Sequence, residues 1–223
     1  MGPASHVRIK ICCIQSAEEA WLAIEHGADA IGLVSAMPSG PGPIPEQRIA
    51  EIARMVPPGV DAFLLTSRTD AAGLVAQVRS LELRTVQLVD RFEAGACQAL
   101  AAALPGVRRV QVIHVNGEDA IADAQAAAGC VHAILLDSGE PDLPVKRLGG
   151  TGRTHDWDVS RRIREAVPVP LWLAGGLRPD NVGEAIRRVG PFGVDVCSGV
   201  RTDGALDPDK LPRFVAAVRA VAP

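Results

Sequence analysis

Cys12 and Asp137 are the two residues of this sequence best suited to transfer a proton. Each stands towards the end of a short apolar run, where a strand would present it to a pocket. A thiol near helix termini that bind phosphate can be tuned toward a reactive thiolate. A carboxyl group in a partly apolar pocket can stay protonated near neutral pH. The pair therefore predicts acid–base chemistry, although a buried cysteine and a loop-capping aspartate are the ordinary alternatives when each is taken alone.

Two glycine-containing segments have the composition of a phosphate site. Residues 174–177 read Ala-Gly-Gly-Leu and residues 197–200 read Cys-Ser-Gly-Val. Small residues let backbone N–H groups approach a dianion closely. Tight turns are the alternative, but two such segments together favour phosphate binding. These segments contain Gly175, Gly176, Ser198 and Gly199.

Short apolar runs alternate with longer amphipathic runs along the chain, as in repeated strand–helix units around a parallel sheet. The expected strands are residues 7–14, 30–35, 62–66, 85–89, 109–115, 133–137, 171–174 and 194–197. The expected helices are residues 17–26, 46–55, 71–80, 93–104, 118–128, 159–166, 180–189 and 208–221. Eight such units predict an α/β fold, a (β/α)8 barrel that forms a single domain over residues 1–223. A doubly wound open sheet is the alternative, but it calls for a glycine fingerprint that residues 12–16 lack.

Functional side chains of such a barrel gather where the strands end. The polar residues at these positions are Cys12, Cys13, Ser39, Ser67, Arg68, Asp90, Arg91, His114, Asp137, Asn181, Asp195 and Ser198. Residues 148–157 form a glycine-rich loop after the sixth strand, which we expect to cover a ligand, a plain spacer being the alternative. Asp90, His114, Asp137 and His155 could supply metal ligands, but four dispersed residues are weak evidence, so we expect no metal and no cofactor.

Composition excludes several classes of partner. The chain is 48% hydrophobic and 22% charged, with a net charge of −3. Its 23 basic residues form no basic stripe, so we expect no nucleic-acid partner. No apolar run reaches the roughly 18–20 residues of a membrane span, and residues 1–6 lack a signal peptide's apolar region. We therefore expect a cytoplasmic protein without a membrane partner.

The five cysteines are an odd number without CxxC spacing, in a chain long enough to fold without cross-links. This pattern predicts free thiols in a reducing compartment.

Nine short motifs together carry a family resemblance. In chain order they are Lys10-Ile11-Cys12, Gly27-Ala28-Asp29-Ala30-Ile31-Gly32, Leu136-Asp137-Ser138, Gly149-Gly150-Thr151-Gly152, Asp156-Trp157, Ala174-Gly175-Gly176-Leu177, Asn181-Val182, Val194-Asp195-Val196 and Ser198-Gly199-Val200. With these motifs in this order, almost the whole chain resembles the phosphoribosylanthranilate isomerase family.

The resemblance implies an Amadori rearrangement in tryptophan biosynthesis, in which a ribosylamine 5-phosphate becomes a 1-amino-1-deoxyribulose 5-phosphate without a cofactor. It implies that Asp137 is the general acid for the ring oxygen and that Cys12 is the general base for the C2′ proton. It puts Asp195 at the ribose or the amine. It also implies that the phosphate is bound by Gly175, Gly176, Ser198 and Gly199. The partner is then a small sugar phosphate, and the barrel is a monomer or a homodimer.

Several positions depart from the family pattern. Pro41 stands where the family has the arginine that meets the anthranilate carboxylate, and Val89-Asp90 stand where it has His-Gly. Cys13 replaces a glycine, Arg153 replaces a lysine, and the fifth strand ends in His114. Asp90, His114 and Arg153 are therefore possible residues of a rebuilt substrate pocket.

These departures leave alternatives open. Another cation such as Arg68, Arg91 or Arg153 can replace the missing arginine, and the reaction is then unchanged. Otherwise the barrel acts on a different phosphorylated sugar as an isomerase, epimerase or aldolase, or binds a phosphate ligand without turnover.

Overall fold

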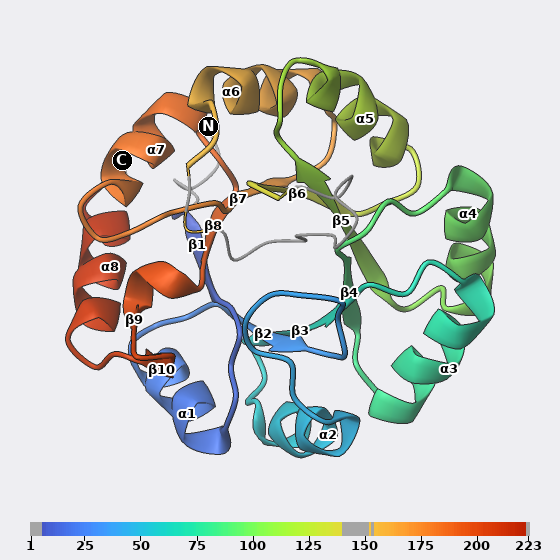
Figure 1. The fold of residues 1–223 in the computed structure, drawn as a ribbon, viewed down its shortest axis with the longest axis horizontal. Coiled ribbons are helices and arrows are strands. Elements are labelled where there is room, and N and C mark those ends of the chain that lie inside the picture. The colour runs from blue at the N-terminus through green and yellow to red at the C-terminus, as the bar shows by residue number, and fades with distance from the viewer. Residues whose placement is uncertain (1–5, 140–151, 153, 222–223) are drawn as a thin grey trace.

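Eight parallel strands form a closed barrel inside a ring of helices (Figure 1). The computed structural model describes residues 6–139, 152 and 154–221. The strands are β1 (Arg8–Ile11), β2 (Ala30–Val34), β3 (Asp61–Thr66), β4 (Thr85–Leu88), β5 (Arg108–His114), β6 (Ala133–Asp137), β7 (Leu171–Leu173) and β8 (Gly193–Val196). Each pairs with the next along the chain, and β1 pairs with β8 to close the barrel. The predicted (β/α)8 barrel is confirmed.

One helix follows each strand and packs on the outside of the barrel. The helices are α1 (Ala17–Glu25), α2 (Glu46–Met55), α3 (Ala71–Leu81), α4 (Ala94–Ala103), α5 (Asp119–Ala128), α6 (Trp157–Ala166), α7 (Val182–Val189) and α8 (Lys210–Arg219). Local sequence signals fix several of their ends. The Ser16 hydroxyl accepts a hydrogen bond from the backbone N–H of Glu19 at the start of α1, and Gly190 ends α7 in the left-handed conformation.

The strands are buried on both faces, which explains their nearly continuous apolar character. Side chains such as Ile9 and Leu33 point outward and form the large core beneath the helices. Side chains such as Leu135 and Trp172 point inward and fill the barrel. The ring of Trp172 meets that of Phe63 edge to face, with ring centroids 5.8 Å apart. The barrel is therefore a packed core, and ligands are confined to its open end.

One element was not predicted from the sequence. After β8 the chain makes a single 3-10 turn, Ser198–Val200, and then a short hairpin of β9 (Arg201–Thr202) and β10 (Ala205–Leu206). Each of these strands is too short to show a period in the sequence. The hairpin is held to α1, because Glu19 accepts hydrogen bonds from the Arg201 guanidinium and the Leu206 N–H.

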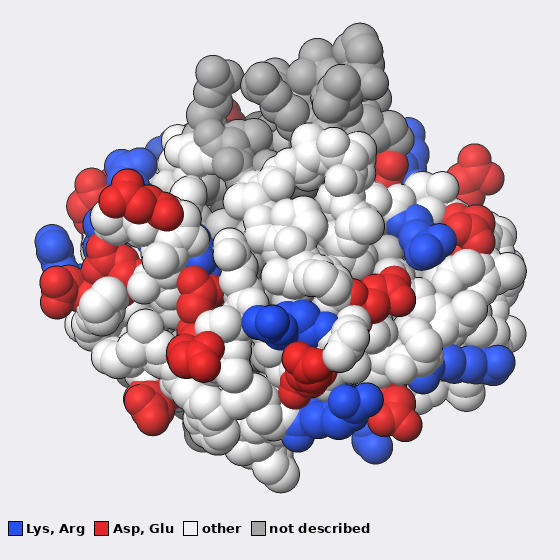
Figure 2. All heavy atoms as spheres, turned by 60° about the horizontal axis from the view of Figure 1, so that its bottom comes forward, with Lys and Arg blue, Asp and Glu red and all other residues white. Residues whose placement is uncertain are grey.

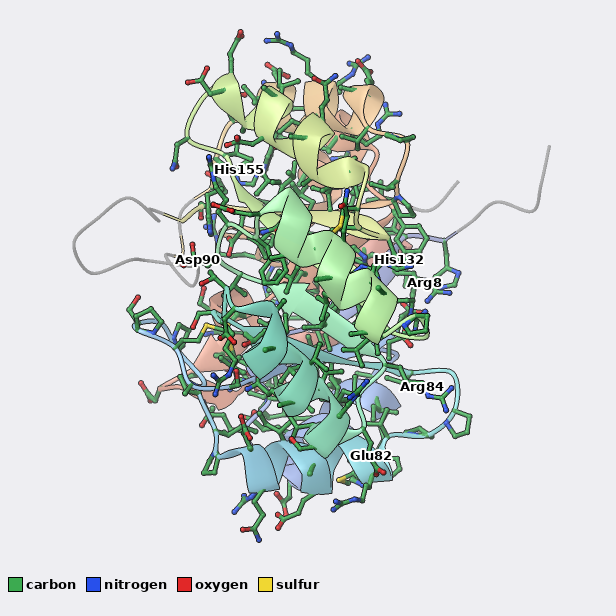
Figure 3. All side chains as sticks on the ribbon, turned by 90° about the vertical axis from the view of Figure 1, so that its right-hand side faces the viewer. Arg8, Glu82, Arg84, Asp90, His132 and His155 are labelled. Carbon is green, nitrogen blue, oxygen red and sulfur yellow. A yellow bond between two sulfur atoms is a disulfide. The ribbon has the colours of Figure 1, made fainter. Side chains whose placement is uncertain are left out.

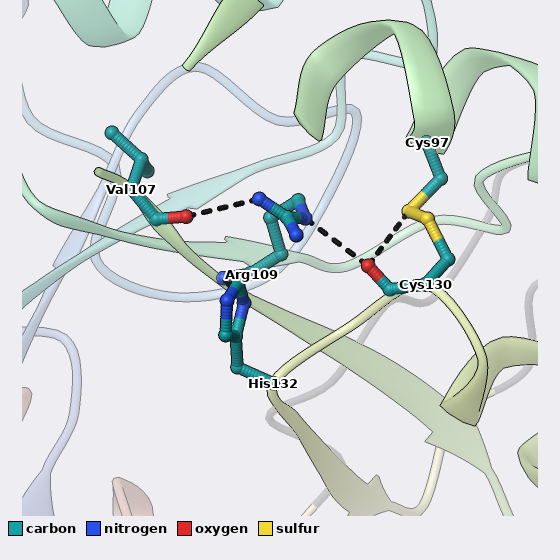
Figure 4. Close-up of a disulfide and its surroundings, with 5 residues drawn as sticks. All are labelled: Cys97, Val107, Arg109, Cys130 and His132. Carbon is teal, nitrogen blue, oxygen red and sulfur yellow. Dashed lines mark hydrogen bonds between the residues drawn. A yellow bond between two sulfur atoms is a disulfide. The ribbon is translucent and has the colours of Figure 1, made fainter. Parts of the chain in front are cut away.

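The expectation of five free thiols is wrong. Cys97 in α4 and Cys130 just after α5 form a disulfide, and Cys12, Cys13 and Cys197 are free (Figure 4). The two bridged residues are 33 positions apart, a separation with no sequence signature, but the fold brings their Cα atoms within 6.2 Å. Beside the bridge, the Arg109 guanidinium donates to the carbonyl oxygen of Cys130.

Within the described residues, no helix combines the length and apolar character that crossing a membrane requires. On the face shown in Figure 2, acidic and basic side chains are interspersed, and no large area carries a single sign of charge. This distribution matches the small net charge of the sequence.

Candidate active site

A pocket opens at the carboxyl end of the barrel, as expected for this fold. Cys12, Asp137 and Asp195 line it from the ends of β1, β6 and β8. The loops after β7 and β8 add the remaining predicted ligands that line it, Gly175, Gly176 and Ser198. The barrel thus brings together, from four separate segments of the chain, the acid, the base and three of the four phosphate ligands proposed from the sequence, whereas Gly199 does not line the pocket.

A buried ion pair lies beneath this pocket. Lys10 of β1 is completely buried, and its Nζ donates a hydrogen bond of 2.9 Å to Oδ1 of Asp195 on β8. Burial alone lowers the pKa of Lys10, but the charge and hydrogen bond of Asp195, together with smaller contributions from Cys12 and Cys13, outweigh this effect and raise the pKa above its ordinary value. A positive charge is therefore fixed inside the barrel. Sequence reasoning missed this role, although Lys10 is the only lysine that lies in a strand among the described residues.

Gly32 of β2 makes room for the base and the cation. A Cβ atom at Gly32 would lie 2.9 Å from Sγ of Cys12 and 3.1 Å from Nζ of Lys10. Both groups therefore converge over this glycine, and the ammonium and the Cys12 sulfur interact electrostatically.

The environment of Asp137 favours a protonated carboxyl group. Burial raises the pKa of Asp137 to about 6, against opposing effects of the Ser138 N–H and the Lys10 charge. The Ser138 N–H donates to Oδ1 of Asp137 at 2.7 Å and orients the carboxyl group. Near neutral pH this group exchanges a proton readily, as a general acid must.

The two glycine segments are in direct contact. A Cβ atom at Gly199 would lie only 1.9 Å from the carbonyl oxygen of Leu177, so the loops after β7 and β8 touch through their backbones. Gly175 has φ +82°, and a Cβ atom there would lie 2.8 Å from the His155 ring. Asn181 holds the first loop, because its Nδ2 donates to the Gly176 carbonyl at 3.0 Å. The result is a rigid rim of small residues.

His155 packs behind this rim, and its position is visible at the same end of the barrel as Asp90 in Figure 3. Its ring nitrogens are buried and have no hydrogen-bond partner among the described residues. Burial lowers the pKa of His155 to about 4, so the ring is neutral near pH 7. It therefore fills space against Gly175.

Arg201 fixes the backbone next to Cys12. Its guanidinium pairs with both carboxylate oxygens of Glu19, at 2.8 and 2.9 Å, and also donates to the carbonyl oxygen of Cys13 at 2.5 Å. Cys13 itself has φ +61°, in the left-handed region. The hairpin after β8 thus fixes the chain just beyond Cys12.

The other predicted pocket residues lie elsewhere. Asp90 and His114 line a second pocket beside α4 and α5, which the disulfide also borders. His114 is the strand-register partner of Asp137, but its Nε2 donates to the Val89 carbonyl at 3.1 Å. Arg153 lies outside the described residues, as do residues 148–151 of the glycine-rich loop 148–157.

The two remaining candidate cations do not line the first pocket. Arg91 pairs with Asp123 at 2.8 Å, and Arg68 is exposed on the loop after β3. Among the residues that the structure describes, no three His, Cys, Asp or Glu side chains are grouped to hold a metal ion. The suggested metal set of Asp90, His114, Asp137 and His155 is therefore not assembled by the described residues.

A closed parallel barrel with titratable groups and glycine loops at its carboxyl end has the architecture of a (β/α)8-barrel enzyme. Comparison with known proteins makes the class narrower. A family model described as N-(5'-phosphoribosyl)anthranilate (PRA) isomerase matches residues 9–217. The chain belongs to the N-(5'-phosphoribosyl)anthranilate isomerase family.

Relatives of the same name match along nearly their full length. An N-(5'-phosphoribosyl)anthranilate isomerase 2 of Methanosarcina mazei is 36% identical over 211 residues, 94% of this chain and 92% of the relative. The Haloferax volcanii enzyme is 37% identical over 214 residues, 95% of this chain and 93% of the relative. The crystal structure of the Thermotoga maritima isomerase has a TM-score of 0.83 at 30% identity, covering 96% of this chain and 99% of its own.

A further solved isomerase is a complex with reduced 1-(o-carboxyphenylamino)-1-deoxyribulose 5-phosphate. It has a TM-score of 0.80 at 28% identity, and the match covers 96% of this chain and 99% of that one.

Proposed function

We propose that this protein catalyses the Amadori rearrangement of N-(5'-phosphoribosyl)anthranilate to 1-(o-carboxyphenylamino)-1-deoxyribulose 5-phosphate, a step of tryptophan biosynthesis. The observation that carries the proposal is the convergence of Cys12, Asp137 and two glycine loops on one pocket. Family membership supplies the substrate class. The reaction moves hydrogen within one molecule, so it requires no external oxidant or reductant.

The 5-phosphate binds at the glycine rim in this proposal. Backbone N–H groups of the loops after β7 and β8 are the donors, from Gly175, Gly176, Ser198 and Gly199. The direct contact between Gly199 and Leu177 supports this assignment, because it keeps the two loops at a fixed separation. The phosphate then anchors the ribose over Asp195.

Asp137 is the general acid that protonates the ribose ring oxygen and opens the ring to a Schiff base. Its raised pKa, about 6, supports this role, because roughly a tenth of the carboxyl groups are protonated at pH 7, far more than at the ordinary pKa of 3.8. Cys12 is the general base that then removes the C2′ proton. The Lys10 ammonium lies close to the Cys12 sulfur over Gly32 and is itself held in place by Asp195.

The anthranilate ring lies against an apolar wall in this proposal. Val34, Met37, Pro41 and Leu65 line the same pocket on the side of β2 and β3. Burying a planar apolar ring against such side chains is favourable at about 25 cal/mol per Å². Pro41 adds apolar surface where the family pattern has an arginine, so more of the binding energy comes from apolar contact.

The proposal extends to partners and location. We propose that the partner is the sugar phosphate alone, without nucleic acid, since the basic residues are scattered. We further propose that the whole chain is one domain, acts as a monomer or homodimer and resides in the cytoplasm with the other steps of amino-acid synthesis. Light scattering and cell fractionation test the last two points.

Rescue of growth tests the function. Expression of the chain in a tryptophan auxotroph that lacks the isomerase is expected to restore growth without tryptophan. Asp137→Asn, expressed at the same level, is the matched control and is expected not to rescue. Failure of the folded wild-type chain to rescue would contradict the proposal. Turnover of another phosphorylated sugar would then favour a different substrate, and binding without turnover would favour a phosphate-binding protein.

A further inference from the structure

Three free thiols meet at the mouth of the barrel. Cys12 and Cys13 follow β1, Cys197 follows β8, and all three line the pocket. Sγ of Cys13 lies 3.8 Å from Sγ of Cys12, and Cys197 lines the same pocket from the end of the neighbouring strand β8. Of these three thiols, only Cys12 transfers a proton in the proposed reaction.

Cys13 and Cys197 have unlike environments. Its hydrogen bonds to neighbouring sulfurs and its burial raise the pKa of Cys13, so this residue is a thiol. The hydrogen bond from Cys13 and the charge of Arg201 lower the pKa of Cys197, against the effect of burial. A cysteine with a lowered pKa beside one with a raised pKa, with a guanidinium nearby, is the arrangement of a redox-reactive cysteine pair.

We propose that Cys13 and Cys197 form a redox-sensitive pair that hydrogen peroxide converts to a disulfide, which reversibly switches the active site off. The pair joins neighbouring strands β1 and β8, so no distant segment has to move. Both residues line the pocket, through which a molecule as small as peroxide can reach them. The regulatory part of this proposal rests on the proposed function.

The chemistry balances in two steps. The Cys197 thiolate attacks one peroxide oxygen, an S–O bond forms as the O–O bond breaks, and hydroxide leaves and is protonated to water. The Cys13 sulfur then attacks the sulfur of the sulfenic acid, losing its proton as the S–S bond forms and the S–O bond breaks, and a second water leaves. Two thiols are oxidised, and one peroxide is reduced to two waters.

The Cys13–Cys197 disulfide would displace both the catalytic base and the phosphate-binding loop. Cys13 directly follows the base Cys12, and Cys197 directly precedes the phosphate ligand Ser198. Drawing the two sulfurs together shifts both neighbours. A misplacement of about 1 Å in an active site costs roughly 100-fold in rate, so kcat/KM is expected to fall by that order.

Peptide mapping tests the pair directly. Trypsin releases Cys12 and Cys13 in peptide 11–48 and Cys197 in peptide 189–201. After peroxide treatment of the full chain, we expect these two peptides to be joined and to separate again with dithiothreitol. The Cys97–Cys130 bridge joins two other peptides, 92–108 and 110–146, and serves as an internal control.

Two variants test whether Cys13 and Cys197 are both required for the cross-link and for the reversible loss of activity. Cys197→Ser removes the reactive sulfur, and Cys13→Gly removes the resolving one at a backbone conformation that glycine adopts freely. Each variant is compared with its own untreated rate. Neither is expected to form the cross-link or to show a loss that dithiothreitol reverses.

Three results would overturn the proposal: no joining of peptides 11–48 and 189–201, a disulfide within peptide 11–48 between Cys12 and Cys13, or a full cross-link with unchanged activity. The peptide measurement does not depend on turnover. If the chain forms the cross-link but does not isomerise the substrate, this result contradicts the proposed function and still supports the redox-sensitive pair of Cys13 and Cys197.

Discussion

Two carboxyl groups at the barrel mouth are given different roles by their surroundings. Asp195 accepts a hydrogen bond from a buried ammonium, so it serves as the partner of a fixed cation. Asp137 accepts only a backbone N–H among its described hydrogen bonds, and burial raises its pKa to about 6. Burial also raises the pKa of Asp195, against the charge and hydrogen bond of Lys10, so the two carboxyl groups differ in their hydrogen-bond partner and not in the direction of their pKa shift.

The buried, ionised carboxyl group of Asp137 is expected to lower the free energy of unfolding of the protein. A carboxyl group whose pKa rises from 3.8 to about 6 on folding destabilises the native state by about 3 kcal/mol above pH 6, and this cost disappears as pH falls toward 3.8. Asp137→Asn is therefore expected to raise the free energy of unfolding at pH 8 and to raise it less at pH 5. Urea titrations measure this, with the exposed Asp209→Asn as control. An equal gain at both pH values would contradict the raised pKa.

At the scale of elements, the pairing of β1 with β8 both closes the barrel and builds the site. Lys10 and Asp195 are register partners in this pairing, and they are 185 residues apart in the sequence. The loops after β7 and β8 meet in the same sector, where Gly199 touches Leu177. Closure of the barrel is thus what places the cation, its partner and the phosphate rim together.

Removal of the buried cation is expected to destabilise this closure. Lys10→Met leaves Asp195 buried without its partner, which costs about 3–5 kcal/mol. The double variant Lys10→Met/Asp195→Asn carries no unpaired charge and is expected to recover most of the loss. Urea unfolding of the three proteins provides the values. A Lys10→Met protein as stable as wild type would contradict the ion-pair assignment.

Separation of the loops after β7 and β8 is expected to weaken binding of the phosphorylated substrate. Gly199→Ala pushes a methyl group into the Leu177 carbonyl and separates the loops, so KM for the phosphorylated substrate is expected to rise by about 10-fold or more, as for a lost anchor of roughly 1.4 kcal/mol. Gly95→Ala, where nothing lies within 4 Å of the new methyl group, is the matched control. Unchanged KM in Gly199→Ala would argue against phosphate binding at this rim.

At the scale of the whole molecule, the disulfide joins α4 to the end of α5 on the outer ring. It closes a loop of 33 residues, and cross-links of this span stabilise by roughly 3–4 kcal/mol through the unfolded chain. Cys97→Ala/Cys130→Ala is therefore expected to lower the unfolding free energy by that amount while kcat/KM stays within about twofold, because the bridge lies outside the active-site pocket. Thermal unfolding and steady-state kinetics measure the two effects. A loss of activity without a loss of stability would contradict this separation.

The alternation of apolar and amphipathic runs was enough to predict all eight strand–helix units, because each element has its own period and boundary signals. The pocket residues at strand ends followed from that topology. The Lys10–Asp195 pair and the Cys97–Cys130 bridge could not be predicted, because both depend on packing between segments distant in the sequence. Asp90 and His114 were assigned by strand position alone, which does not say into which of two neighbouring pockets a side chain opens.

Turnover of N-(5'-phosphoribosyl)anthranilate by the purified chain tests the acid–base assignment most directly. Wild type is expected to form 1-(o-carboxyphenylamino)-1-deoxyribulose 5-phosphate, and Cys12→Ser and Asp137→Asn are each expected to lower kcat/KM by about 10²–10⁴-fold while folded. Absence of turnover by the wild type, or variants as active as the wild type, would contradict the assignment of Cys12 and Asp137 as base and acid.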